Sequence, residues 1–372
     1  MIGSSRDDHE KEGALFCRIR GIDVVRHYGD PMGEYQAAVS SVVMRDRGHR
    51  SRFLITGKNP VDTLNGTLTG RMPSPPAGSY KNGAIGRAEY SAVLTPKGRV
   101  VTDLRVMWGA DPEKESLWLD VPAPGAGPML EHLKRYVPPR LATVDDVSED
   151  VGIITVLGPM AGEALEEISF ISAEMKVVLD NLAENEYLIV GKEGERIVRN
   201  PAVNTLAWDI FTSKEGSRKL WTKFLSQGIK PMGVSVWDTL RIEAGRPAFG
   251  QDMDESKMLP ETSIVDIAVD HSKGCYTGQE VIVRIRDRGH VNKSLRGLYL
   301  GDGPAPRSNA EIFYEGNNVG HITSVADSPR YGGRIALGYI RREVSLGEAV
   351  TIGSPDGAQA VVRELGPEWA AF

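Results

Sequence analysis

The spacing of the hydrophobic positions changes repeatedly between residues 34 and 289, which indicates a mixture of strands and helices. Apolar residues at helical spacing predict helices that begin near residues 59, 128, 159, 217 and 235. The segment 72–85 is rich in Pro, Gly and Ser and predicts a loop. Short apolar runs between turn residues predict strands at 53–56, 90–94, 100–108, 117–121, 153–157, 187–190, 196–199 and 206–211. We therefore expect an α+β body.

The pattern changes after about residue 291, where short apolar runs recur between Gly, Pro and Asn turns. Six strands are predicted there, at 295–300, 311–313, 321–324, 335–340, 349–352 and 360–363. Such a series is typical of a small all-β barrel or sandwich of roughly 80 residues. The first twelve residues are polar and acidic, and we expect a disordered arm. The predicted division is an arm at 1–12, an α+β region at 13–290 and a β domain at 291–372.

Composition narrows the range of functions. The 372 residues are 41% hydrophobic and 25% charged, as in an ordinary globular protein, and the net charge of −6 argues against a general nucleic-acid binder. The sequence contains no apolar run of membrane-spanning length and no signal-peptide core at its start, so we expect a cytoplasmic protein without a membrane partner. Two cysteines are too few for a disulfide framework, and the absence of closely spaced ligand motifs predicts no metal site.

Cys275 lies in the string KGCYTGQE at 273–280, between a lysine and two glycines. Thr277 and Glu280 have the spacing of a capping box, so we expect a helix to begin there. A nearby lysine and a helix N-terminus both favour a thiolate, which would suit a nucleophile, a redox thiol or a ligand of a cluster. The alternative is a small buried side chain, which is how free cysteines usually behave.

Two further charged residues are candidates for the functional site. Asp103 is a lone carboxylate in the predicted strand 100–108, which a Pro96-Lys97-Gly98 turn joins to the strand 90–94 as a hairpin. An inward Asp103 would need partners or a raised pKa, whereas an outward one would be solvated. Arg284, with two further arginines spaced two residues apart, forms either an anion site or a solvated charged face.

Several motifs together resemble those of a known superfamily. The string KGCYTGQE resembles the K-G-C-[FY]-x-G-Q-E signature of the folate-binding YgfZ type, a branch of the aminomethyltransferase (glycine-cleavage T-protein, GcvT) superfamily. Further segments resemble motifs of the T-proteins, and they extend the resemblance over nearly the whole chain: LGP at 157–159, DTLRIEAG at 238–245, FGQDMDE at 249–255, GHITS at 320–324 and IALGYI at 335–340.

The resemblance implies a three-domain cloverleaf, in which two intertwined α/β folate-binding units and a C-terminal small β-barrel surround a central tetrahydrofolate site. By the resemblance, Asp103 matches an aspartate beside the reactive folate nitrogens, and Tyr90, thirteen residues earlier, matches a folate-contacting tyrosine. Asp209 takes the place of the carboxylate that hydrogen-bonds the pterin. Trp237 replaces an arginine of the transferases, and with Arg284 it completes the expected cofactor-binding set.

The resemblance also implies a function. The leading hypothesis is a tetrahydrofolate-binding protein of the YgfZ type that supports assembly or repair of iron–sulfur proteins through folate-linked one-carbon chemistry, with Asp103 and Cys275 as reactive residues. The first alternative is a folate-dependent aminomethyltransferase or demethylase, and the second is a non-catalytic scaffold. The expected partners are folate and either an iron–sulfur client or a lipoyl carrier protein. Two departures from the T-protein motifs, Trp237 and the segment 202–209, argue against the aminomethyltransferase of the glycine cleavage system.

Overall fold

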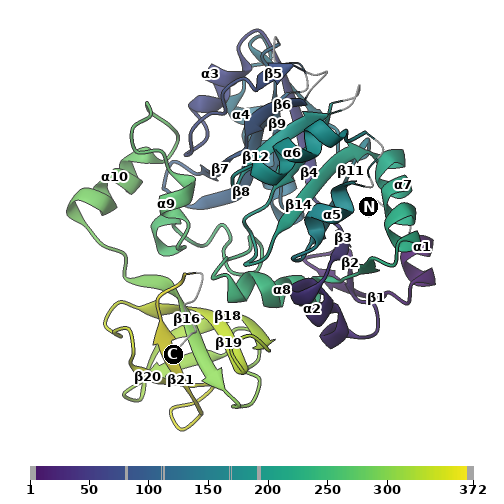
Figure 1. Cartoon of the computed structure of the whole chain (residues 1–372). Coiled ribbons are helices and arrows are strands. Elements are labelled where there is room, and N and C mark those ends of the chain that lie inside the picture. The colour runs from purple at the N-terminus through teal and green to yellow at the C-terminus, as the bar shows by residue number, and fades with distance from the viewer. Residues whose placement is uncertain are drawn as a thin grey trace.

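The chain forms two sheets that pack against each other, with a small barrel attached to one end (Figure 1). A computed structural model describes the chain over residues 6–79, 83–109, 111, 114–166, 168, 170–190 and 194–366. Within these ranges, no helix is both long enough and apolar enough to cross a membrane.

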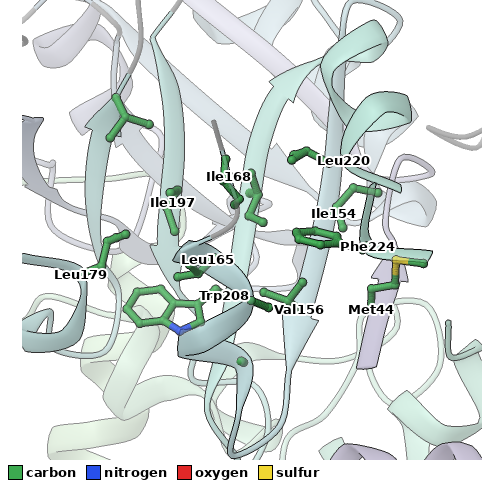
Figure 2. Close-up of a cluster of buried hydrophobic side chains, with 14 of the residues drawn as sticks. Met44, Ile154, Val156, Leu165, Ile168, Leu179, Ile197, Trp208, Leu220 and Phe224 are labelled. Carbon is green, nitrogen blue, oxygen red and sulfur yellow. The ribbon is translucent and has the colours of Figure 1, made fainter. Parts of the chain in front are cut away.

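The larger sheet has eight strands in the order β15-β3-β11-β14-β13-β12-β6-β5. Three helices cover one of its faces, and their apolar side chains meet those of the strands in the cluster that Figure 2 shows around Trp208 and Phe224. Strands of this sheet are buried on both faces, and their nearly continuous apolar sequences follow from that. The strands are β3 (Val43–Asp46), β5 (Ala77–Ser79), β6 (Gly83–Arg87), β11 (Val151–Leu157), β12 (Glu186–Val190), β13 (Glu195–Arg199), β14 (Ala207–Ser213) and β15 (Lys230–Pro231), and the helices are α5 (Ala161–Glu166), α6 (Ala173–Asn181) and α7 (Lys214–Ser226).

The smaller sheet has five strands in the order β10-β4-β9-β8-β7. Its outer face packs on two helices through Leu64, Met129 and Leu133. Its inner face meets the larger sheet where Met107 and Trp118 pack against Tyr187. The strands are β4 (Ser51–Gly57), β7 (Glu89–Leu94), β8 (Val100–Trp108), β9 (Leu117–Val121) and β10 (Ala142–Asp146), and the helices are α3 (Pro60–Asn65) and α4 (Ala126–Tyr136).

The C-terminal strands close into a barrel in the order β16-β19-β18-β17-β20-β21, which decides between the predicted barrel and sandwich. Ile242 of helix α8 (Val234–Glu243) packs with Leu295 and Tyr339 of the barrel, so this helix joins the barrel to the body. The barrel strands are β16 (Lys293–Gly301), β17 (Glu311–Tyr314), β18 (Asn317–Ser328), β19 (Gly333–Arg341), β20 (Ala349–Ile352) and β21 (Ala358–Arg363).

The N-terminal segment differs from the prediction. Helix α1 (Arg6–Lys11) occupies part of the expected disordered arm, because His9 is fully buried, lies 2.7 Å from the hydroxyl of Tyr28 and meets the ring of Trp221 edge-on. Residues 1–5 lie outside the described part. The hairpin β1 (Leu15–Ile19) and β2 (Ile22–His27) follows α1, and then comes α2 (Pro31–Ser40).

Two other predictions are corrected by the structure. The predicted loop 72–85 contains β5 and the start of β6, because this segment adds two strands to the edge of the larger sheet; residues 80–82 lie outside the described part. Helix α10 (Gln279–Arg288) follows Gly278, whose φ of 84° is left-handed, and it has no side-chain cap. The predicted capping box of Thr277 and Glu280 is therefore wrong. Three short helical elements, η1 (Ala123–Gly125), η2 (Leu259–Glu261) and α9 (Val265–Ala268), complete the body.

Candidate functional site

A cavity of about 490 Å³ opens where the two sheets meet α8 and the loop that follows it. Its volume lies in the roughly 300–1,000 Å³ range of small-molecule sites. Three aromatic side chains, Tyr90, Trp237 and Phe249, contribute to its wall together with charged groups from β3, β8 and α8. This mixture of aromatic surface and a few polar groups is typical of a site that binds a planar organic ligand.

The hairpin of β7 and β8 brings Tyr90 and Asp103 together at the cavity wall. Tyr90 pairs with Arg105 across the two strands, so its ring leans towards Asp103, which lies two residues earlier on the same face. The Tyr90 hydroxyl donates a hydrogen bond to Oδ2 of Asp103 at 2.6 Å. Asp103 is only 9% exposed, so the inward alternative is confirmed.

The second oxygen of Asp103 is free. Oδ1 is buried and has no hydrogen-bond partner among the described residues. Burial raises the pKa of the Asp103 carboxyl, while the Tyr90 hydrogen bond and the charge of Arg50 act in the opposite direction. A carboxyl with a raised pKa and one open oxygen at a cavity wall is suited to exchanging a proton with a bound ligand.

A network of arginines and aspartates lies between the two sheets, and its arginines reach the cavity wall while its aspartates lie behind it. Asp209 of β14 accepts hydrogen bonds from Arg47 at 3.0 and 3.1 Å and from Arg105 of β8 at 2.5 Å. Asp120 of β9 accepts from Arg105 at 2.7 and 3.0 Å and from Arg50 at 2.6 Å. Arg105 therefore ties the smaller sheet to the larger one through Asp209, while Asp120 holds it from the neighbouring strand of its own sheet.

Asp209, which the resemblance assigns to the pterin, is engaged by protein groups in this structure. It is fully buried, does not line the cavity, and also accepts hydrogen bonds from Thr155 at 2.6 Å and Asn200 at 2.8 Å. Burial alone would raise its pKa, but the charges of Arg47 and Arg105 outweigh burial and lower it to about 2. With both oxygens engaged, Asp209 serves to hold the two sheets together and is closed to a ligand in this arrangement.

Trp237 lies at the cavity wall, and two arginines lie over its ring. The guanidinium carbons of Arg45 and Arg47 are 4.9 and 4.8 Å from its ring centroid. The sequence reasoning missed both arginines. The sequence signal that could have revealed them is the run RDRGHRSR at 45–52, which places four arginines at the junction of two strands. So many charges can be buried together only if they have partners or bind a ligand.

Cys275 and Arg284 lie outside the cavity lining. Cys275 is exposed, which rules out the buried alternative, and the segment that carries it is fixed on both sides. Lys273 Nζ donates to the carbonyls of Leu68 and Gly70 at 2.7 and 2.8 Å, and Tyr276 is buried. Arg284 is exposed on α10, at the left edge of Figure 1, as a solvated charged face would be. The structure therefore does not bring Cys275, Arg284 and Asp103 into one site.

No group of three or more His, Cys, Asp or Glu side chains within the described ranges could hold a metal ion. The chemistry that the cavity offers is therefore that of Asp103, Tyr90 and the arginines around Trp237. These groups can move a proton, bind an anion and hold an aromatic ring system.

Comparison with known proteins identifies the family. The model of the GCVT N-terminal domain matches residues 5–273, and that of the glycine cleavage T-protein C-terminal barrel domain matches residues 293–364. An aminomethyltransferase of Synechocystis sp. is 29% identical over 314 residues, which cover 84% of this chain and 81% of that protein. One of Picosynechococcus sp. is 26% identical over 341 residues, which cover 91% and 90%.

The fold agrees with these matches. The crystal structure of glycine cleavage system aminomethyltransferase T from Bartonella henselae has a TM-score of 0.83 with this chain at 18% identity, over 98% of this chain and 96% of that one. The expected α+β fold with a C-terminal barrel is thus confirmed. Since the N-terminal domain model alone spans well over half of the sequence, the chain belongs to the glycine cleavage T-protein (GCVT) family.

Proposed function

We propose that this protein is a tetrahydrofolate-dependent one-carbon transferase of the aminomethyltransferase type. The observation that carries the proposal is the Tyr90–Asp103 pair at the wall of the cavity, with Oδ1 of Asp103 buried and open. Relatives named aminomethyltransferase match along most of the chain and support the same chemistry. The YgfZ-type hypothesis is less well supported, because the relatives that match are named for the transferase reaction.

The residues of the cavity fit tetrahydrofolate. An elongated ligand with a flat ring system finds the aromatic side chains of Tyr90, Trp237 and Phe249 around a volume of about 490 Å³. The open Oδ1 of Asp103 lacks a donor, and a ligand N–H would supply one. Asp209 is not needed for this fit. When bound, tetrahydrofolate supplies the nitrogens that take up the transferred carbon.

In the proposed reaction, Asp103 handles the proton. The Tyr90 hydroxyl fixes the carboxyl through Oδ2, so Oδ1 keeps one orientation towards the ligand. Because burial raises the pKa of Asp103, its carboxyl is a better base than an exposed aspartate, so it can take a proton from the reacting nitrogen and return it to the departing group. The surrounding apolar side chains limit the access of water, which keeps the proton exchange between Asp103 and the ligand.

A second candidate function rests on Cys275. The thiol is exposed on a segment that Lys273 and Tyr276 fix to the body, which suits a reaction with a protein partner at the surface. Under the YgfZ-type hypothesis that partner is an iron–sulfur client. The glycine-cleavage form of the transferase hypothesis takes its carbon from a lipoyl carrier protein, whereas the demethylase form takes it from a methylated small molecule. In either case we propose folate as the ligand of the cavity.

Titration calorimetry with tetrahydrofolate tests the proposal first, and the absence of binding by the wild-type protein would overturn it. Transfer of a ¹³C-labelled aminomethyl carbon from a lipoyl carrier protein, or of a ¹³C-methyl group from a methylated small molecule, is then followed by mass spectrometry. Asp103→Asn should lower turnover about 10²- to 10⁴-fold while tetrahydrofolate still binds. Asp287→Asn, at an exposed carboxylate on α10, is the matched control. Loss of turnover with Cys275→Ser alone would favour the second candidate.

A further inference from the structure

Arg45 is a buried cation at the cavity wall, and its guanidinium forms no ion pair with a carboxylate of the described residues. Its side chain lines the cavity and is 6% exposed. The guanidinium also makes no hydrogen bond within the described ranges, and it lies over the ring of Trp237, 4.9 Å from the ring centroid. A buried guanidinium normally has its donors paired, because an unpaired buried charge costs several kcal/mol.

The neighbouring arginines are different. Arg47 is paired with Asp209, and Arg50 with Asp120. Arg241 of α8 is paired with Asp238 and with Asp252. Asp238 and Asp209, the carboxylates whose charges act on Arg45, are thus engaged by other arginines. Burial, and then the charge of Arg47, lower the pKa of Arg45 to about 9, as expected for a guanidinium without a partner.

The fold places Arg45 deep in the wall. It pairs with Thr155 in the register of β3 and β11, and Thr155 pairs in turn with Asp209. The Thr155 hydroxyl donates to Asp209, so it is turned away from Arg45. The indole of Trp237 lies against the guanidinium and supports it, and the planar group keeps donors free for a bidentate oxyanion.

We propose that Arg45, supported by Trp237, binds a carboxylate or a similar small oxyanion of the one-carbon donor. The donor would then be a small anionic molecule with a transferable N-, O- or S-linked carbon. This inference rests on the proposed function, because it assigns the second substrate of the same cavity. The glutamate of tetrahydrofolate is another source of carboxylate, and the experiment separates the two.

The probes are three methylated carboxylic acids, N,N-dimethylglycine, methoxyacetate and methylthioacetate, each compared with the amide that lacks its carboxylate charge. Tetrahydrofolate and tetrahydropteroate, which lacks the glutamate, test the rival source. Binding to the full-length protein is measured by calorimetry. The variants are Arg45→Met, which keeps the aliphatic stem, and Arg45→Lys, which keeps the charge. Arg199→Met is the matched control, because Arg199 also lies over a tryptophan, Trp208 at 5.3 Å, but does not line the cavity.

We expect the wild-type protein to prefer at least one acid to its amide by about 10- to 100-fold, the range for charge-assisted hydrogen bonds. Arg45→Met should abolish that preference, Arg45→Lys should keep part of it, and Arg199→Met should leave it intact. Binding of tetrahydrofolate should be unchanged in all three variants.

Two results would overturn the inference. In one, Arg45→Met weakens binding of tetrahydrofolate but not of tetrahydropteroate, which assigns the anion to the glutamate. In the other, the wild-type protein binds tetrahydrofolate and distinguishes none of the acids from its amide. If tetrahydrofolate itself does not bind, the proposed function fails, whereas the preference for an acid over its amide remains measurable.

Discussion

Replacing Asp209 by asparagine removes the charge that holds two arginines between the sheets. The asparagine has the same shape, so the packing around it is kept. Arg105 retains Asp120, but Arg47 loses its carboxylate partner. The substitution therefore leaves one buried guanidinium uncompensated and turns an amide N–H₂ towards donors that need an acceptor.

The magnitude follows from two arguments. Removing one partner of a buried pair destabilises a protein by about 3–5 kcal/mol. Independently, a fall in the pKa of Asp209 from 3.8 to about 2 corresponds to about 2 kcal/mol of stability. Because the folded-state pKa is depressed, this contribution is present above pH 4 and is lost as the pH falls through about 2. We expect a loss of about 2–5 kcal/mol at pH 7 for Asp209→Asn.

Urea unfolding followed by tryptophan fluorescence at pH 7 measures this loss. Glu149→Gln is the control, because its ion pair with Lys214 at 3.0 Å is exposed and should be worth less than about 1 kcal/mol. The double variant Asp209→Asn/Arg47→Met removes the orphaned charge and should recover about 1–3 kcal/mol relative to the single variant. A loss below about 1 kcal/mol for Asp209→Asn, or a double variant no more stable than the single one, would refute the reasoning.

Three further predictions concern the site and the barrel. Tyr90→Phe should move the acidic limb of the pH–rate profile to higher pH, because the lost hydrogen bond favoured ionised Asp103; an unshifted limb would contradict this assignment. In the native protein, maleimide should modify the exposed Cys275 faster than Cys17, because burial raises the pKa of the Cys17 thiol. Peptide mass spectrometry measures both rates, and equal rates would contradict this prediction. Asp252→Asn should speed amide hydrogen exchange in β18, because the Asp252 carboxylate accepts hydrogen bonds from Thr323 and Ser324 of that strand. Unchanged exchange would show that this carboxylate does not help to hold the barrel against the body.

The parts of the site that depend on local structure could be predicted from the sequence. The turn between the strands 90–94 and 100–108 fixes their register, so the distance of thirteen residues between Tyr90 and Asp103 becomes a contact between neighbouring strands. The existence of the C-terminal strands is predictable for the same reason, since apolar runs between turns mark them, whereas their closure into a barrel was implied only by the resemblance. In both cases the sequence pattern and the packing agree.

The parts that depend on the packing of the sheets could not be predicted. Arg47 and Asp209 are separated by 162 positions in the chain, and their contact exists because β3 and β14 flank β11 in one sheet. The resemblance therefore assigned Asp209 to the ligand, whereas in the folded chain its carboxylate is bound by Arg47 and Arg105. The helix start at Thr277 was misplaced because a left-handed glycine at Gly278 redirects the backbone before the helix begins.

Helix α8 belongs to the cavity on one side and to the barrel on the other. Trp237 lies at the cavity wall, while Arg241 donates to Ser324 of β18 at 2.9 Å and Glu243 accepts from Ser328 at 2.5 Å. Any coupling through this helix is reciprocal: if a ligand that restrains Trp237 changes the affinity of the barrel for a macromolecule, that macromolecule changes the affinity of the cavity for the ligand by the same factor, without touching it.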